Sequence, residues 1–212
     1  MVYFWITIWY INALLFTILD HSKIKVYIFY DPESFKDQSE QMYHDAVKLY
    51  GKDAVAMSNV TTEKEFAQDW KNMLGTDIRE VNLNYHGNNQ TLILDNTNNE
   101  YVTATGDGKT NKYGNDALNV QDLPKPLGNI TNAQLNINSC KSNSTDQNEL
   151  KGSKQTLMQA FRNSFDFYKV RGTSNGVSYD RETKQPFPGH RYWPGKWDYM
   201  ERPRKGSSSV SP

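Results

Sequence analysis

A histidine and the single cysteine of the chain each follow a run of alternating residues that predicts a β-strand. His86 ends the segment 81–86, and Cys140 ends the segment 133–140. A cysteine attacks as its thiolate, and a nearby imidazole favours that form and can later protonate a leaving group. The residue types and their positions therefore indicate a nucleophile and its general acid–base partner.

The two predicted strands also agree in register. Side chains alternate between the faces of a strand, so Asn82 and Asn84 share a face with the histidine. Asn136 and Asn138 share a face with the cysteine in the same way. Reactive groups of open parallel sheets collect beyond the carboxyl ends of the strands. If the strands are neighbours, the imidazole and the thiol can face each other across a crevice. The asparagines have no explanation at this level, because central strands buried on both faces are usually apolar.

Acyl transfer to a thiolate also needs N–H donors that stabilise an oxyanion. Gly87 has no side chain, so its N–H can approach a substrate closely, and the N–H of Cys140 is the second candidate donor. The alternative interpretation is a strand-end histidine and a small buried thiol without catalytic function.

The elements that must position these residues alternate between strands and helices. Apolar, β-branched and aromatic runs predict strands at 24–30, 54–57, 78–85, 133–139 and 169–173. Helical spacing predicts helices over about 31–50, 62–75 and 153–168. This alternation implies parallel pairing with right-handed crossovers. We therefore expect an α/β fold of three layers, with a central, mostly parallel sheet flanked by helices.

Local signals refine these elements. Asp31 is placed as the N-cap of the first helix, and Thr62 with Glu65 has the spacing of a capping box. Two short strands around an Asn-rich turn predict a hairpin within 91–104, and 106–128 is expected to be a long loop.

The chain divides into four parts by composition. They are an apolar leader at 1–20, the α/β domain at 21–180, an aromatic and proline-rich extension packed on the domain at 181–202, and a disordered tail at 203–212.

The leader is uncharged over residues 1–19. As a helix it would span about 28 Å, close to the thickness of a bilayer core. It lacks a positive start and a clear cleavage site. A membrane anchor, an uncleaved export signal and a buried apolar segment all remain open interpretations.

Composition excludes several classes of function. The 24 Lys and Arg residues balance the 24 Asp and Glu residues, so no excess charge is available to hold a phosphate backbone, and nucleic acid is not an expected partner. One cysteine cannot form an internal disulfide, and with scattered histidines it gives no zinc-ligand spacing. We expect no metal and no cofactor, which also disfavours a nuclease.

A hydrophobic strand ending in His86-Gly87, followed by a later strand ending in Ser139-Cys140, resembles the caspase-like superfamily of cysteine peptidases, clan CD. The resemblance covers about residues 24–180 and includes the order, histidine before cysteine. It implies a mainly parallel sheet between helices and peptide-bond hydrolysis. His86 would be the general acid–base, Cys140 the nucleophile, and Gly87 with Cys140 the oxyanion hole.

The same resemblance suggests further site residues. Asp31 lies where some toxin-processing relatives carry an acid that orients the histidine, although an N-cap role is a sufficient explanation for it. Asn138 lies where caspase-like enzymes often place a residue of the S1 pocket. Ser174 and Asn175 are candidates for the wall of that pocket, with a structural turn as the alternative.

Four stretches of the chain also resemble the C-terminal variable tips of bacterial Rhs-repeat proteins. They are VYIFYDPESF, VNLNYHGNNQTL, LNINSCKSN and LMQAFRNSFDFYKVRGTSNGVSYD. Such tips are often toxin or processing modules. The expected partners are then a protein or peptide substrate, the chain itself included, an immunity protein, and a membrane through residues 1–19.

The main competing class is a catalytically silent caspase-like module that binds a partner or anchors at a membrane. The two classes differ in whether function depends on Cys140.

Overall fold

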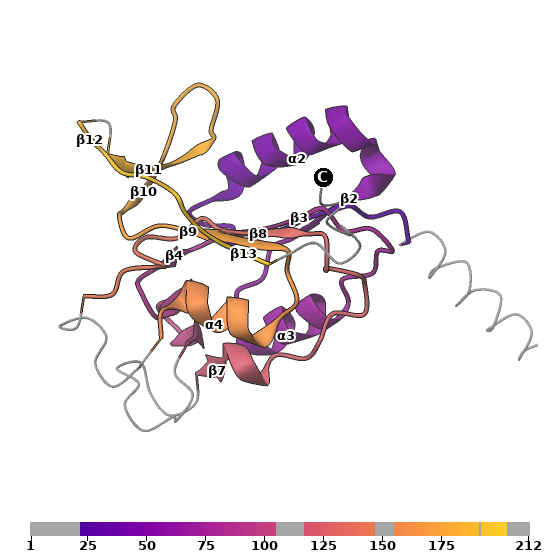
Figure 1. Cartoon of the computed structure of the whole chain (residues 1–212). Helices are drawn as coiled ribbons and strands as arrows, with labels where there is room; N and C mark the ends of the chain where they lie inside the picture. Colours follow the sequence, from indigo (N-terminus) through magenta and orange to yellow (C-terminus); the bar gives the residue numbers. More distant parts are fainter. Residues whose placement is uncertain (1–21, 105–116, 147–154, 191, 203–212) are drawn as a thin grey trace, which may run out of the picture.

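The computed structural model describes residues 22–104, 117–146, 155–190 and 192–202. Its centre is a sheet of six strands in the order β2-β1-β3-β8-β9-β13 (Figure 1). The strands are β1 (Val26–Tyr30), β2 (Val55–Ser58), β3 (Glu80–Asn84), β8 (Gln134–Ile137), β9 (Lys169–Gly172) and β13 (Asp198–Glu201). The first five run parallel, and β13 pairs antiparallel with β9. The prediction of an α/β fold with a mostly parallel central sheet is confirmed.

Helices lie on both sides of this sheet. Helix α2 (Lys36–Tyr50) covers one face, and α3 (Glu63–Lys71) and α4 (Leu157–Ser164) lie on the other (Figure 1). The three layers follow from the crossovers between parallel strands, each of which must place its helix against the sheet.

The face toward α3 and α4 carries the main apolar core. Leu83, Leu135 and Ile137 of the two central strands are fully buried in it, as the alternation of their side chains predicts. Trp70 of α3 lies among the phenylalanines of this core. On the opposite face, Val26 and Ile28 are buried in a smaller apolar cluster beneath α2.

The helix ends agree only in part with the signals in the sequence. Thr62 is the N-cap of α3 and accepts a hydrogen bond from the Glu65 N–H, so the predicted cap is confirmed. The reciprocal bond of a capping box does not form among the described residues, because the Glu65 carboxylate accepts from the Thr62 hydroxyl and not from its N–H. The prediction that Asp31 caps α2 is wrong, because the helix begins only at Lys36. The Asp31 carboxylate instead accepts the Glu33 N–H at 2.9 Å and closes a turn before the helix.

The third helix also begins later than predicted. Thr156 caps α4 in a reciprocal capping box with Gln159, whereas the predicted start, Ser153, lies outside the described residues. The helix ends at Ser164, so the apolar residues that continue its spacing to position 168 belong to the following connection.

The segment between β3 and β8 forms a second, smaller sheet. Its strands are β4 (His86–Gly87), β5 (Thr91–Asp95), β6 (Glu100–Thr103) and β7 (Leu118–Asn119). The predicted hairpin is confirmed by the antiparallel pairing of β5 with β6. The predicted long loop is wrong in part, because β7 pairs with β6 and a 3₁₀ turn follows at Val120–Asp122. Residues 105–116 of that loop lie outside the described residues.

The C-terminal extension, 181–202, forms strands. Strands β10 (Val177–Tyr179), β11 (Pro186–His190) and β12 (Trp193–Pro194) form a third small sheet, and β13 then joins the central sheet. The predicted leader and tail, 1–20 and 203–212, lie outside the described residues. Within the part that is described, no helix has the length and hydropathy to cross a membrane.

Because of Tyr27 of β1, the stability of the fold should fall as the pH rises in the alkaline range. Its hydroxyl accepts the Leu74 N–H at 2.7 Å and donates to the Leu74 carbonyl, and burial raises its pKa from 10.0 to about 12. A raised pKa in the folded state means that the contribution to stability is complete below pH 10 and is lost as the pH rises toward 12. We expect a loss of roughly 2–3 kcal/mol over this window. Urea unfolding of wild type and Tyr27→Phe from pH 8 to 11.5 checks this, since the two curves should converge with rising pH.

Candidate functional site

His86 and Cys140 lie just beyond the carboxyl ends of two neighbouring strands at the centre of the sheet. β3 and β8 run parallel with Leu83 opposite Ile137, and the Asn138 N–H donates to the Leu83 carbonyl at 2.9 Å. Beyond this bond the chain continues into His86 on one strand and into Cys140 on the other. The two residues therefore leave the same carboxyl edge of the sheet, as the predicted registers require.

Close packing joins the two segments at this edge. A Cβ placed on Gly87 would lie 3.0 Å from the Ser139 hydroxyl oxygen and 2.5 Å from the Thr91 carbonyl oxygen. The His86-Gly87 backbone is thus pressed against Ser139, the residue next to Cys140. Only glycine allows this approach, so the structure assigns Gly87 a steric function that the sequence analysis did not identify.

Gly87→Ala is expected to be destabilising because neither neighbour can move freely. Thr91 is held in the β5–β6 hairpin and Ser139 is fully buried, so the added methyl group must shift backbone. We expect a cost of about 1–3 kcal/mol in the free energy of unfolding. Denaturant unfolding checks this, with Gly176→Ala as the matched control, because a Cβ at Gly176 meets no atom within 4 Å. Equal stability of the two variants would contradict the packing.

The Cys140 thiol is half-buried and lies against the first residue of β10. The Val177 N–H donates to its Sγ at 3.3 Å. Two residues further along, the Tyr179 hydroxyl donates to the Asn138 carbonyl at 3.4 Å. Burial raises the pKa of this hydroxyl well above its usual value, the charge of Cys140 adds to the effect, and Arg171 opposes it. Strand β10 therefore forms one wall beside the thiol.

His86 is exposed and packs against an aromatic ring. The centroid of the Phe35 ring lies 4.9 Å from the imidazole centroid and 5.5 Å from the centroid of Tyr179. Phe35 thus links the histidine to the wall beside the thiol. Among the described residues no hydrogen bond joins His86 to Cys140. Imidazole–thiol contacts of this kind are often long without substrate, and here the two side chains lie at the same edge without a direct bond.

The turn at Cys140 has the features of an oxyanion site. Lys141 has a φ of 57° and donates its N–H to the Asn175 carbonyl at 2.7 Å, which fixes the turn. Within the described part of the chain, the Cys140 N–H has no hydrogen-bond partner. A backbone donor that is fixed and available is what an oxyanion requires.

The other predicted site residues have structural contacts. Asn138 is buried, and its amide bonds to Asn84 and Arg171, so it lies beneath the edge that carries Cys140. Asn175 supports the Cys140 turn through its carbonyl, as described above. Ser174 donates both its N–H and its hydroxyl to the Asp198 carboxylate, at 3.1 and 3.0 Å.

Asp31 lies near the site without a contact to the histidine. Its N–H donates to the Asn84 carbonyl, and its carboxylate is engaged by the Glu33 N–H, as described for the helix end. The role of an orienting acid stays a prediction.

Sequence reasoning missed residues that organise the surroundings of the site. Arg171 of β9 is half-buried, bonds to Asn138 and stacks on Trp197 with its guanidinium carbon 4.3 Å from the ring centroid. An arginine inside an alternating strand was the available signal. Asp198 accepts from Asn143 as well as from Ser174, and so joins the connections that follow β8 and β9. No pattern in the sequence marks it.

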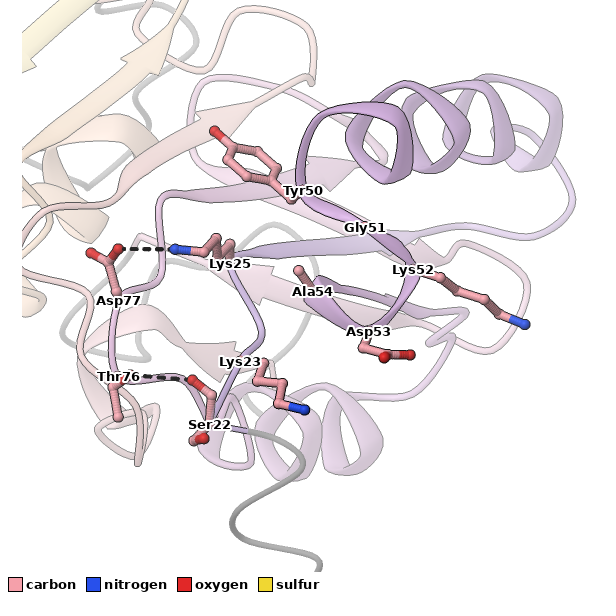
Figure 2. Close-up of a pocket in the computed structure, with 10 residues that line it drawn as sticks. All are labelled: Ser22, Lys23, Lys25, Tyr50, Gly51, Lys52, Asp53, Ala54, Thr76 and Asp77. Atoms are coloured by element: carbon pink, nitrogen blue, oxygen red, sulfur yellow. Dashed lines mark hydrogen bonds and ion pairs between the residues drawn. The ribbon is translucent and has the colours of Figure 1, made fainter.

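The two described cavities lie away from His86 and Cys140. One, of about 450 Å³, opens at the amino ends of the parallel strands, which is the opposite edge of the sheet. Figure 2 shows Lys25 paired with Asp77 there, and Thr76 bonded to Ser22. The second, of about 250 Å³, lies beneath α2 beside Glu80 and Arg171. Neither of these two cavities is lined by His86 or Cys140.

No group of three or more metal-ligating side chains occurs among the described residues. Comparisons with protein-family models, with curated proteins and with solved structures find no match for this chain.

Proposed function

We propose that the α/β domain is a cysteine endopeptidase of the caspase-like type, with His86 and Cys140 as its catalytic pair. The observation that carries this proposal is that both residues lie at one edge, just beyond the carboxyl ends of the neighbouring parallel strands β3 and β8. The mostly parallel sheet between helices agrees with what the resemblance of the His-Gly and Ser-Cys motifs implies for the fold.

In the proposed reaction the Cys140 thiolate attacks the carbonyl carbon of the scissile peptide. The carbonyl π electrons move to oxygen, where the N–H groups of Gly87 and Cys140 stabilise the oxyanion. As the intermediate collapses, the C–N bond breaks and the His86 imidazolium protonates the leaving amine. A water molecule, deprotonated by His86, then hydrolyses the thioester and releases the acid and the thiolate.

Cleavage that depends on Cys140 tests the proposal. Wild type and Cys140→Ala are purified as the full chain and incubated with a diverse peptide library, and cleavage is read by mass spectrometry. Cut peptides with wild type alone would support the proposal, and the intact mass of the protein would reveal cleavage of the chain itself. A folded wild type that cuts nothing, and whose thiol does not react with peptide electrophiles, would contradict it.

A catalytically silent binding module is the second candidate. It is favoured by the thiol contact with Val177 in place of a bond to the imidazole, and by the packing of Phe35 on His86. For such a module, Cys140→Ala should leave binding of its protein partner unchanged.

A further inference from the structure

The two central strands carry pairs of buried amides on the face toward α2. Asn136 donates to Asn82 at 3.0 Å, and one row nearer the carboxyl edge Asn138 donates to Asn84 at 2.8 Å. All four residues are buried. Strands that are covered on both faces are usually apolar, so these amides need a reason other than burial.

The Asn84–Asn138 pair is extended on both sides by further hydrogen bonds. The Asn84 amide donates to the Ser39 hydroxyl of α2 at 2.8 Å. The Asn138 side-chain oxygen accepts from the Arg171 guanidinium of β9 at 2.9 Å. The chain of bonds therefore crosses from the helix layer through three neighbouring strands, and the stack of Arg171 on Trp197 fixes its far end.

The position of this pair is special in the ladder between β3 and β8. Among the described residues, the backbone ladder between these two segments ends with the bond from the Asn138 N–H to the Leu83 carbonyl. Beyond it the first chain turns into β4 and the second into the Cys140 turn. The Asn84–Asn138 bond thus lies at the end of this backbone ladder, two residues before His86 and two before Cys140.

The chemistry of an amide pair suits this place. A buried amide hydrogen bond adds little net stability compared with an apolar pair of similar shape, but leaving one partner unpaired is costly. The bond is also directional. A slip of one residue would put Leu83 or Ile137 on this face and leave an amide without a partner, so the pair favours a single register.

We propose that Asn84 and Asn138 are positioning residues that set the register and separation of His86 and Cys140. This inference rests on the proposed function, since it gives the pair a task only if the imidazole and the thiol act together. The Asn82–Asn136 pair has the same chemistry, but it lies one row further from the edge that carries His86 and Cys140.

Asn138→Ala and Asn136→Ala form a matched comparison. Both residues lie on the same strand and face, both are buried, and both bond to more than one side chain. With the full chain, we expect kcat for peptide cleavage to fall about 10- to 100-fold in Asn138→Ala with KM changed less than about threefold, because small misplacements of reacting groups have effects of this size. Asn136→Ala should retain kcat within about threefold once the folded fraction is taken into account.

A second measurement keeps this inference distinguishable from the proposed function. Cys140 is the single cysteine, so its rate of alkylation by iodoacetamide against pH reports on one thiol. In wild type, alkylation should become half-maximal at a lower pH than in His86→Ala, because the imidazole favours the thiolate. In Asn138→Ala the curve should move toward that of His86→Ala, while Asn136→Ala should keep the wild-type curve.

Each outcome decides something. If wild type and His86→Ala have the same curve, the proposed dyad is wrong and the inference fails with it. If those two differ but Asn138→Ala follows wild type, or Asn136→Ala moves equally, the dyad stands and the positioning role is wrong. Should Asn138→Ala not fold, Asn138→Asp replaces it, since a carboxylate still accepts from Arg171 but cannot donate to Asn84.

Discussion

Replacing Trp70 with alanine should lower the free energy of unfolding by roughly 3–5 kcal/mol. Trp70 is fully buried, and its ring lies 5.0 Å from that of Phe165 and 5.5 Å from that of Phe161, measured between centroids. It joins α3 to α4 beneath the sheet, so the cavity left by truncation cannot close without moving a helix. Urea unfolding followed by circular dichroism measures the change.

Two further substitutions make this prediction specific. The indole N–H of Trp70 is buried and has no partner among the described residues, so Trp70→Phe removes an unsatisfied donor and should cost far less than Trp70→Ala. Trp193→Ala is the surface control, because 80% of Trp193 is exposed. If all three variants lost similar stability, the placement of Trp70 at the centre of the core would be wrong.

His86→Ala should reduce kcat/KM for peptide cleavage by about 10²–10⁴-fold if the proposed function is correct. The imidazole is expected to favour the thiolate and to protonate the leaving amine, and the other two described histidines lie on α2 (His44) and β11 (His190). Because His86 is exposed, its removal should have little effect on folding. Steady-state kinetics with the best peptide from the library screen provides the measurement.

His44→Ala is the matched control for this experiment. His44 is also an exposed histidine next to an aromatic ring, that of Tyr43, but it lies on α2. Its replacement should leave kcat/KM unchanged. If His86→Ala stayed active and still required Cys140, another group would carry out the proton transfers and the proposed His86–Cys140 dyad would be wrong.

The sequence predicted the architecture well because the strands and crossovers leave local signals. Alternation around His86 and Cys140 fixed which side chains share a face, and the structure confirms it for the asparagines and for the apolar residues between them. The predicted start of α2 was wrong because the Asp31-Pro32-Glu33 sequence suits a tight turn as well as a helix start. Local chemistry alone does not separate these two structures.

The surroundings of the site were less predictable because they depend on contacts distant in sequence. The amides of Asn84 and Asn138 had no explanation until β3 and β8 were seen side by side, with Arg171 of β9 next to them. The Asp198 carboxylate accepts hydrogen bonds from Asn143 and Ser174, and neither spacing nor composition in the sequence links these three residues. The packing of Gly87 on Ser139 likewise appears only in three dimensions.

The late position of strand β13 in the sequence decides when the connections around the site are joined during synthesis. Its Asp198 ties together the connections after β8 and β9, yet it is made after both of them. Ribosomes add about 5–20 residues per second, so a nascent chain contains Cys140 for several seconds before Asp198 is made. The order of translation therefore delays the hydrogen bonds that join the connections after β8 and β9.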